Sequence, residues 1–419
     1  MVTNKTNNSR NQKNQLNPSN PLYWGKLDTI ASVKFRNIQK LQNVKESFFG
    51  SAPAPFVGHF AYPNINLGIL APPELREDAA ELDAQRSWAA KNLDIPEIVG
   101  YRSQLINARD KVAITDARHN PHRSNKLLEV AQEVALSPKA VDLEVQLKKK
   151  PQISFQTDPF LPPHAANAII ERATITENPR IPQKVDQVIA DDLSAAEQLA
   201  ELNKQFDEQY LSKILSVGLL GKKENKKLVP TRWSITATDD TLGKQQIEEL
   251  RMYRRNEEYL FYFGGYLGNY YAFLVFPEIW SYELFEIYAG DRNGDEKGTF
   301  MTDHEQFAGR KSYANHCVGG YYACRLALTE KLLQKKRQAS ILALRFITDD
   351  YTTPLGVWVC REASRKSLAS QALSFASKEL LLDFVRRKMQ NSFGIDCSRF
   401  FTLSKILTEQ KQQRKLWEF

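Results

Sequence analysis

The spacing of hydrophobic and polar positions predicts both strands and helices along this chain. Residues 339–347 (ASILALRFI) are almost continuously apolar, which is typical of a strand covered on both faces of its sheet. Residues 318–337 repeat apolar side chains at the spacing of an amphipathic helix. The same reasoning predicts helices at 74–92, 97–112, 183–217 and 377–389, and a strand or hairpin at 141–155. The mixture predicts an α/β or α+β fold, in which helices flank a mixed β-sheet.

The segment 259–288 is rich in aromatic residues, since thirteen of its thirty residues are Phe, Tyr or Trp. It predicts two or three strands, joined at Gly264-Gly265 and near Pro277. Exposed aromatic rings could stack on single-stranded bases. These strands are apolar on both faces, however, so we expect them to form part of a core.

Two other segments carry mixed signals. Residues 228–238 predict a strand that leads into a helix at about 241–251. Thr353-Pro354 is a favourable helix start, with Thr as the cap and Pro in the first helical position. The apolar run at 357–360 also allows a strand there, and the pattern leaves both alternatives open.

Composition divides the chain into parts. Residues 1–20 include seven asparagines and almost no apolar side chains, so they cannot offset the entropy of ordering, and we expect a disordered tail. We expect a globular α/β region at 21–300 and a second region at 301–395. Residues 396–419 form a basic, Gln-rich extension that ends in a short peptide motif.

The overall composition narrows the class of protein. Of the 419 residues, 42% are hydrophobic and 25% are charged, as in soluble globular proteins. The net charge of +8 permits contact with nucleic acid without requiring it. No apolar run is long enough for a transmembrane helix, and the first residues do not resemble a secretory signal, so we expect no membrane association.

The cysteines indicate a reducing compartment. Cys317, Cys324, Cys360 and Cys397 all lie in the last quarter of the chain, and no two of them form a C-x-x-C pair. This spacing argues against a zinc site, and we predict no metal-ligating cysteines. We expect reduced thiols and a cytoplasmic location.

The segment 413–419 (QRKLWEF) matches the pattern of a peptide that binds the replication sliding clamp PCNA, called the PIP box. Gln413 is followed by the aliphatic Leu416 three residues later and by the aromatic Phe419 six residues later. One helical turn would place Leu416 and Phe419 on the same face, as anchors for a hydrophobic groove. Trp417 could add to this contact. The alternative is an amphipathic turn that packs on its own domain.

The first candidate for chemistry is Arg232 with Asp239 and Asp240. A strand that ends in paired carboxylates, at the carboxyl edge of a sheet, is a common place for a ligand. The two carboxylates could hold Mg²⁺, and Arg232 could bind a phosphate. In the alternative interpretation, Asp240 caps the following helix and Arg232 pairs with one of the carboxylates.

The second candidate is the run Asp303-His304-Glu305, with Arg310, Lys311 and His316 downstream. Folded together, these groups could perform acid–base chemistry or ligate a metal, and Arg310 and Lys311 could bind a ligand or phosphate. If they converged with Asp239 and Asp240, a metal-dependent phosphodiesterase would be a reasonable hypothesis. The alternative is a solvated, charged loop.

The third candidate is the turn that begins at Gly50-Ser51, with His59, Asn64 and Asn66 after it. Glycine-rich turns can bind phosphate through backbone amides, but the prolines here remove such donors. The spacing matches no known nucleotide-binding loop. A rigid turn between strands is the alternative.

Four blocks of this sequence resemble the archaeal Nre family. They are FGS at 49–51 with FVG through YPNINLG at 56–68, VPTRWSITA with the aspartate pair at 229–240, GRK through GGYY at 309–322, and RQAS through PLGVW at 337–358. The family is associated with DNA repair, and many members end in a clamp-binding motif. Many relatives also carry a cysteine-rich N-terminus, which this chain does not have.

The resemblance implies a DNA repair protein that binds PCNA through residues 413–419 and contacts DNA. The alternative hypothesis is a metal-dependent hydrolase that acts on nucleic acid or on a nucleotide adduct in the same pathway. The resemblance supplies a pathway and a partner but no reaction, so the sequence leaves open whether the protein is an enzyme.

Overall fold

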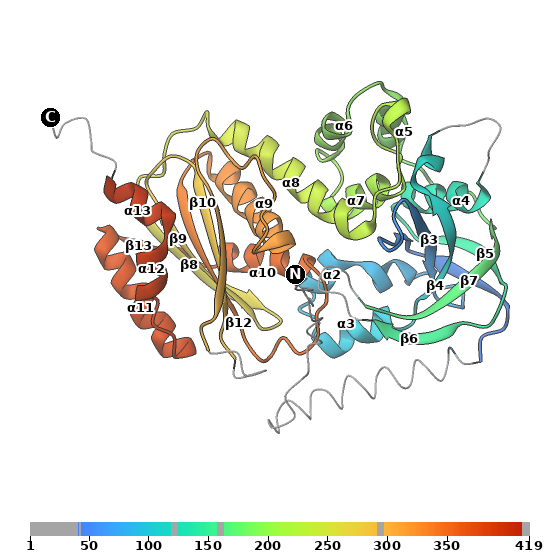
Figure 1. The fold of residues 1–419 in the computed structure, drawn as a ribbon, viewed down its shortest axis with the longest axis horizontal. Helices are drawn as coiled ribbons and strands as arrows, with labels where there is room; N and C mark the ends of the chain where they lie inside the picture. The colour runs from blue at the N-terminus through green and yellow to red at the C-terminus, as the bar shows by residue number, and fades with distance from the viewer. Residues whose placement is uncertain (1–40, 42, 119–124, 157–162, 291–296, 413–419) are drawn as a thin grey trace, which may run out of the picture.

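The protein is built on two mixed β-sheets, each with its own helices (Figure 1). The computed structural model describes residue 41 and residues 43–118, 125–156, 163–290 and 297–412. We call the first sheet with its helices the first lobe, and the second sheet with its helices the second lobe. The predicted fold class, with mixed sheets flanked by helices, is confirmed.

The first sheet has the strand order β1-β5-β7-β4-β3-β2, with β6 also paired to β7. Only the β4–β7 pair is parallel among the pairs described. The strands are β1 (Ser47–Ala52), β2 (Ala54–Val57), β3 (Asn64–Ala71), β4 (Ile106–Ala113), β5 (Val141–Leu147), β6 (Gln152–Gln156) and β7 (His164–Ile175). The segment 141–155 therefore forms two strands as predicted, but each pairs with β7, so the hairpin alternative is wrong.

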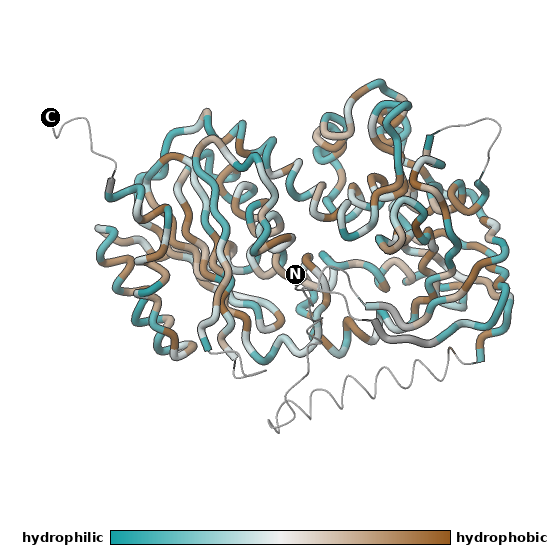
Figure 2. Tube along the Cα trace, in the orientation of Figure 1, coloured by the Kyte–Doolittle hydropathy of each residue, from teal (hydrophilic) through white to brown (hydrophobic). Residues whose placement is uncertain are grey.

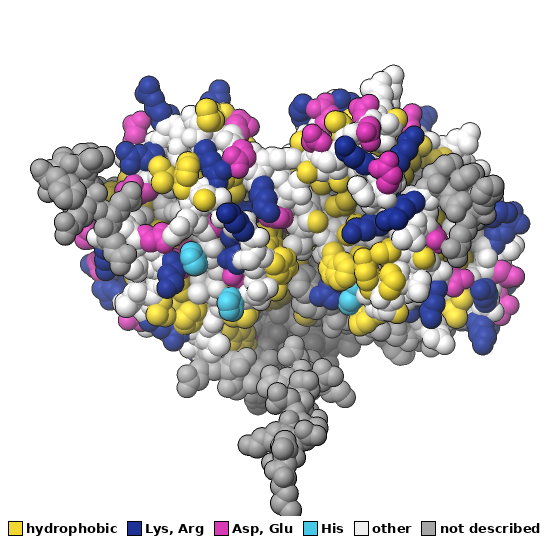
Figure 3. Space-filling model, turned by 45° about the horizontal axis from the view of Figure 1, so that its top comes forward, with side chains coloured by type: hydrophobic (Ala, Val, Ile, Leu, Met, Phe, Trp, Pro, Cys, Tyr) yellow, Lys and Arg dark blue, Asp and Glu magenta, His cyan; other side chains and the backbone are white. Residues whose placement is uncertain are grey.

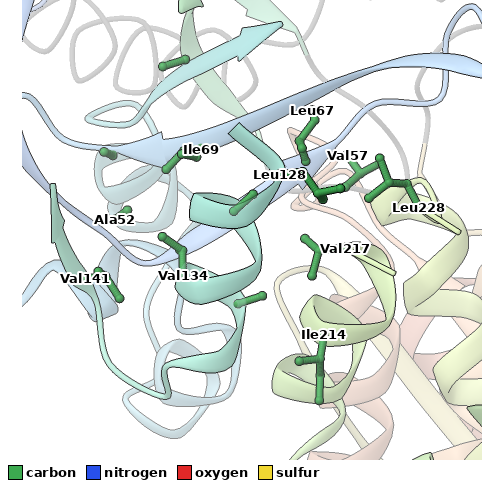
Figure 4. Packing of buried hydrophobic residues seen from close by; sticks show 14 of the residues in the cluster. Ala52, Val57, Leu67, Ile69, Leu128, Val134, Val141, Ile214, Val217 and Leu228 are labelled. Carbon is green, nitrogen blue, oxygen red and sulfur yellow. The ribbon is translucent and has the colours of Figure 1, made fainter. Parts of the chain in front are cut away.

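The first lobe closes its core with helices packed on one face of this sheet. Helix α4 (Lys126–Leu136) directs Leu128 and Val134 toward strand residues such as Ile69, and Ile214 and Val217 lie beside them (Figure 4). The helices of this lobe are η1 (Ala79–Asp83), η2 (Ile114–Ala117), α4, α5 (Gln183–Ala190), α6 (Ala195–Leu202), α7 (Glu208–Ser216) and η3 (Lys223–Asn225). Burial of these aliphatic side chains stabilises the fold by roughly 1.5–3 kcal/mol for each one fully buried. Helices α2 (Gln85–Ala90) and α3 (Ile95–Arg102) come between β3 and β4 in the chain, but their buried residues, such as Trp88 and Ile98, belong to the core on one face of the second sheet.

The second sheet has the strand order β11-β10-β12-β9-β8-β13 and is covered on both faces. Its strands are β8 (Tyr259–Tyr266), β9 (Asn269–Phe276), β10 (Ser281–Tyr288), β11 (Phe300–Glu305), β12 (Ser340–Ile347) and β13 (Leu373–Phe375). One face carries α9 (Val318–Lys335) and α10 (Trp358–Ala369), and the other carries α11 (Lys378–Phe393), α12 (Ser398–Leu403) and α13 (Lys405–Gln412). Strand β12 lies inside the sheet and is buried almost throughout, which confirms the prediction for 339–347. This sheet takes strands from both sides of residue 300.

The aromatic segment 259–288 forms the predicted core strands β8, β9 and β10. The turn between β8 and β9 lies at Leu267-Gly268, whereas Gly264 and Gly265 lie inside β8, so the predicted turn position is wrong. Gly264 is close-packed, because a Cβ there would lie 2.9 Å from the Cα atom of Ser367 on α10. A glycine inside a strand can mark such a close approach of backbones as well as a turn.

One long helix, α8 (Thr231–Leu250), runs between the two lobes and packs on α7 of the first and α9 of the second (Figure 1). The strand predicted at 228–238 is therefore wrong. Its β-branched residues suggested a strand, but their burial follows helical contacts on both sides of α8. Along the tube, apolar segments gather on the strands and on the helix surfaces that face them (Figure 2).

Several other predicted boundaries need correction. The helix expected at 97–112 ends at Arg102, and β4 follows it. The helix expected at 74–92 is η1 followed by α2, and that expected at 183–217 is the three helices α5, α6 and α7. Helix α10 begins at Trp358, so the strand alternative at 357–360 is wrong, and the start predicted at Thr353-Pro354 is too early. Much of the expected extension at 396–412 is helical and docked, with Ile406 and Leu407 buried.

The four cysteines are unpaired and buried, as expected for reduced thiols. Within the described ranges, none of the helices is both long and apolar enough to span a bilayer. The tail expected at residues 1–20 lies outside the described residues.

Candidate functional site

The first turn of α8 lies against the loop between β2 and β3. The backbone amide of Val57 donates a hydrogen bond to Thr231 Oγ1 at 2.9 Å, which fixes the end of β2 to the start of the helix. In the next residue, Arg232 Nη1 lies 3.0 Å from His59 Nε2. The sequence analysis named both Arg232 and His59 but placed them in separate candidate sites. The structure brings them together across 173 positions of the chain.

Exposed aromatic side chains surround this contact. Phe60 is 72% exposed, Tyr62 and Trp233 are each 46% exposed, and Tyr313 is 45% exposed. The ring centroids of Tyr62 and Trp233 are 5.5 Å apart, and the ring of Phe60 lies 4.0 Å from that of His59. We call Phe60, Tyr62, Trp233 and Tyr313 the aromatic patch. Large apolar groups clustered on a surface commonly mark a binding site.

Tyr313 connects the aromatic patch to the second lobe. It lies in the segment between β11 and α9, and its ring centroid is 5.3 Å from that of Tyr322 on α9. Burial raises the pKa of Tyr313, whereas a hydrogen bond with Thr236 and the charge of Arg232 lower it, so its phenol lies beside α8. The patch therefore includes residues from both lobes. Figure 3 shows hydrophobic and basic side chains side by side next to the hollow between the lobes.

Basic residues precede α8 directly. The segment 222–227 (KKENKK) contains four lysines and one glutamate and leads through Pro230 into the helix. Arg118 Nε donates to the backbone oxygen of Lys226 at 3.4 Å, so a further cation lies beside this segment. Burial, and then the charge of Lys223, lowers the pKa of Lys226, as expected where positive charges gather. The start of α8 thus combines exposed rings with a concentration of positive charge.

Asp239 is buried in an ion network between the lobes. Arg361 Nη1, from α10, donates to both carboxylate oxygens of Asp239 at 2.8 and 2.9 Å. Arg361 Nε also lies 2.8 Å from Glu208 of α7, and Arg365 donates to both oxygens of the same Glu208. Burial raises the pKa of Asp239 to about 6, although Arg361 opposes this shift. Burial also disfavours the charge of Glu208, but Arg361 and Arg365 outweigh it and hold the pKa of Glu208 well below its usual range.

Asp240 belongs to a second buried network. Arg325 of α9 donates to Asp240 Oδ1 at 2.5 Å and to Glu305 Oε2 at 2.9 Å. Trp280 Nε1 donates to the other carboxylate oxygen of Glu305 at 3.2 Å. Burial opposes the charge of Arg325, but Glu305 and Asp240 outweigh it and raise its pKa. Asp240 and Glu305, one residue from each acidic segment, therefore share Arg325, and this arginine occupies the position between their carboxylates.

The run Asp303-His304-Glu305 does not gather at one site. It forms β11, so the expected charged loop is wrong, and successive side chains of a strand point to opposite faces. Asp303 and Glu305 face α9, whereas His304 lies opposite Glu283, which faces α13. The sheet separates His304 from its two neighbours. The structure therefore does not bring His304 and Glu305 together, as the acid–base hypothesis for this run required.

The remaining members of that candidate site have structural contacts. Asp303 accepts hydrogen bonds from the backbone amides of His316 and Cys317 at 3.0 and 2.7 Å, and so holds the start of α9. Arg310 lies 3.2 Å from Asp303 and donates to the backbone oxygen of His304. Lys311 is exposed next to Arg310, in the segment between β11 and α9.

The turn expected at Gly50-Ser51 is wrong, because both residues lie inside β1 and are buried. Ser51 Oγ donates to Asp142 at 2.5 Å and accepts from the amide of Arg76. A Cβ at Gly50 would lie 2.1 Å from the backbone oxygen of Pro72, so this glycine allows a close approach of two backbones. Asn64 and Asn66 lie in β3, and the backbone oxygen of Asn66 accepts from Gly58 at the base of the β2–β3 loop.

The described part of the chain contains no group of three or more His, Cys, Asp or Glu side chains arranged to hold a metal ion. The carboxylates of Asp239 and Asp240, which were the candidate Mg²⁺ ligands, pair with Arg361 and Arg325 instead. Arg232, predicted to accompany them, lies with His59. The predicted clamp-binding residues Gln413, Leu416, Trp417 and Phe419 lie outside the described residues.

The aromatic patch was not predicted from the sequence. Trp233 lies in the segment that was interpreted as a strand, and Phe60 and Tyr62 lie among apolar residues between Gly58 and Leu67. The one segment for which stacking on bases was considered, 259–288, was expected to be core, and its rings are mostly buried. One available signal was that Phe60, Tyr62 and Trp233 belong to two of the four blocks that carry the family resemblance.

The sequence matches the two family models described as archaeal Nre, N-terminal, over residues 29–292, and archaeal Nre, C-terminal, over residues 305–419. DNA repair protein NreB of Archaeoglobus fulgidus is 34% identical over 383 residues, which cover 90% of this chain and 93% of that protein. DNA repair protein NreA of the same organism is 32% identical over 360 residues, covering 85% and 89% of the two chains. DNA repair protein NreA of Haloferax volcanii is 32% identical over 372 residues, covering 87% of each chain. No solved structure matches the chain.

Proposed function

This chain belongs to the archaeal Nre family, and on that premise we propose that it acts in DNA repair, contacts DNA at the start of α8, and is recruited by the sliding clamp through residues 413–419. The relatives that it matches over most of their length are named DNA repair proteins. Their names support the role in repair. The two contacts rest on features of this chain.

The DNA contact rests on one observation, the concentration of cations around the first turn of α8. Lys222, Lys223, Lys226 and Lys227 precede the helix, Arg118 lies beside them, and Arg232 follows. Lys311 adds an exposed cation in the segment between β11 and α9, which also carries Tyr313 of the aromatic patch. Phosphate contacts by Lys and Arg supply most of the affinity of proteins for DNA and make that affinity fall with salt. By contrast, the acidic residues of α8 that lie nearest, Asp239 and Asp240, are already neutralised by arginines.

The clamp contact rests on the spacing of Gln413, Leu416 and Phe419, with Trp417 between the two anchors. The structure shows how the helix that precedes this peptide is held. Glu283 of β10 accepts hydrogen bonds from Ser404 Oγ at 2.6 Å and from the amides of Lys405 and Ile406, which holds the start of α13. The peptide therefore continues from a helix that is anchored on the second sheet, away from the first lobe (Figure 1).

The DNA contact is tested by fluorescence anisotropy with a labelled oligonucleotide at several salt concentrations. We expect affinity to fall steeply with salt, because bound counterions are released from the phosphates. Replacing Lys226 and Lys227 with Gln should weaken binding and reduce the salt dependence. Replacing Lys388 and Arg387 of α11 with Gln, which removes two cations on the far side of the second sheet, is the matched control. Equal losses in both variants would contradict the proposed surface.

The clamp contact is tested by calorimetry, with the sliding clamp of the same organism titrated with the full chain and with a chain that ends at Gln412. A peptide of this kind should bind at micromolar affinity or better, which corresponds to about 8 kcal/mol. Leu416→Ala with Phe419→Ala should abolish binding, because these side chains supply the apolar anchors. Equal binding by the full and shortened chains would show that the segment is not the tether.

A further inference from the structure

Contact with phosphates requires cations and not aromatic rings, so the aromatic patch needs a separate explanation. Phe60, Tyr62 and Trp233 expose roughly half or more of their side chains, whereas the rings of the second sheet lie mostly in the clusters on its two faces. Exposing such rings to water forgoes the 1.5–3 kcal/mol that burial of a large apolar side chain contributes. A ligand that covers them would recover part of this free energy.

The rings are held in place before any ligand binds. The β2–β3 loop is fixed at its base by the hydrogen bond from Gly58 to the backbone oxygen of Asn66 at 2.8 Å, and within it Asn64 donates to the backbone oxygen of Ala61 at 2.9 Å. The bond from Val57 to Thr231 attaches the loop to α8. Trp233 itself projects from the first turn of that helix. A preorganised surface loses little conformational entropy when it binds.

The rings are arranged to stack on a flat ligand rather than on each other. The planes of Tyr62 and Trp233 are tilted by 53°, so the two rings do not stack together. The neighbouring cation, Arg232, lies with His59 beside them. Flat apolar faces next to positive charge match a nucleotide, in which a base stacks on a ring and its phosphate meets a cation.

Duplex DNA does not present base faces, because they are covered by the neighbouring base pairs. Single-stranded DNA and unpaired bases in gaps or damaged sites do present them. A surface that only neutralised duplex phosphates would need cations alone. We infer that the aromatic patch binds unpaired bases, so that the protein prefers DNA with single-stranded character over intact duplex. This inference rests on the proposed contact with DNA and specifies the kind of DNA.

The first test compares the affinity for a labelled 20-nucleotide oligo(dT) with that for a blunt duplex of the same length, at one salt concentration. We expect the single strand to bind at least tenfold more tightly. Trp233→Ala should weaken single-strand binding by roughly 5- to 150-fold, which is the range for loss of one stacked base. It should leave duplex binding and the salt dependence unchanged, because no charge is removed. Tyr62→Ala serves as a second variant in case Trp233→Ala lowers the melting temperature.

Phe49→Ala is the matched control. Phe49 is 51% exposed and lies in β1, at the opposite edge of the first sheet from β2, so its loss removes an exposed ring outside the patch. Trp233→Phe should retain affinity within a few fold, because a smaller ring still stacks. It should also lose most of the quenching of tryptophan emission that accompanies binding to oligo(dT). This quenching would be a direct signal of stacking on residue 233.

The outcomes distinguish a failure of the inference about unpaired bases from a failure of the proposed contact with DNA. If duplex and single strand bind equally and Trp233→Ala changes neither affinity, the inference about unpaired bases is overturned, whereas the contact with DNA stands. If neither DNA binds, the proposed contact itself fails. If Phe49→Ala weakens binding as much as Trp233→Ala does, the aromatic patch is not the site of stacking.

Discussion

Arg361→Gln should destabilise the protein strongly, because it removes a positive charge that two buried carboxylates share. Arg361 contacts Asp239 at 2.8 and 2.9 Å and Glu208 at 2.8 Å, and its side chain is 3% exposed. Glu208 retains Arg365, but Asp239 loses the group that pairs with it directly. Breaking a buried ion pair from one side typically costs about 3–5 kcal/mol.

This loss can be converted into a shift in melting temperature. For a chain of 419 residues that unfolds as one unit, the entropy of unfolding is about 0.9 kcal/mol per degree. A loss of about 3–5 kcal/mol therefore lowers the melting temperature by roughly 3–6 °C. The shift would be larger if the two lobes unfolded separately, because the entropy of each transition would be smaller.

The pH dependence has a definite sign. Burial raises the pKa of Asp239 from 3.8 to about 6, so the folded protein binds this proton more tightly than the unfolded chain does. Stability from this group is therefore present at low pH and is lost as the pH rises through the window from about 4 to 6. Without Arg361 the pKa of Asp239 should rise further. The defect of Arg361→Gln should then be larger at pH 8 than at pH 5.

Asp239→Asn is the companion variant. It removes the carboxylate but leaves Arg361 paired with Glu208, so at pH 8 we expect a change within about 1 kcal/mol. Relative to the original chain, it should gain roughly 1–1.5 kcal/mol between pH 5 and pH 8, because the original chain must ionise Asp239 over this range. Both variants can be measured by urea denaturation at pH 5 and pH 8. The reasoning is wrong if Arg361→Gln is as stable as the original chain, or if Asp239→Asn is the more damaging of the two.

Three further predictions concern other parts of the molecule. Arg232→Gln should lower the slope of the logarithm of DNA affinity against the logarithm of salt concentration by about 0.7–0.9, as measured by anisotropy, and an unchanged slope would remove Arg232 from the phosphate contacts. Glu283→Ala should leave the hydroxyl of Ser404 and two amides of α13 without their buried acceptor, which should lower the free energy of unfolding by about 1–3 kcal/mol. Amide hydrogen exchange should then become faster in α13 before it does in other helices, and an equal increase in all helices would refute this anchoring. Gly50→Ala should destabilise by roughly 1–3 kcal/mol, because its Cβ would lie 2.1 Å from the backbone oxygen of Pro72, and an unchanged melting temperature would contradict this contact.

Local pattern was sufficient where one kind of contact dominates an element. Strand β12 is apolar on both faces because helices cover both sides of its sheet. Helix α9 was predicted from its apolar spacing, although most of its residues are buried because α8 and α10 also pack on it. The aromatic core strands β8, β9 and β10 were predicted for the same reason as β12. In each of these strands the side chains on both faces meet an apolar environment, so the sequence pattern agrees with the structure.

Local pattern failed where an element contacts several surfaces. Helix α8 touches α7 on one side and α9 on the other, so its buried residues do not follow one stripe, and its threonines suggested a strand. The same error misplaced the chemistry, because a strand would have ended at Asp239 and Asp240, whereas the helix directs them toward Arg361 and Arg325. In β11, alternation along the strand separated His304 from Glu305.

The family, the mixed α/β class, the unpaired cysteines and the peptide pattern at 413–419 could be predicted from the sequence, because each of these is carried by neighbouring residues or by composition. Which charged groups form buried pairs and which lie at the surface depends on the tertiary structure. The partners of Arg232, Asp239 and Asp240 are 173, 122 and 85 positions away along the chain. Contacts over such separations depend on how two sheets pack around one helix, and no local spacing of residues records that packing.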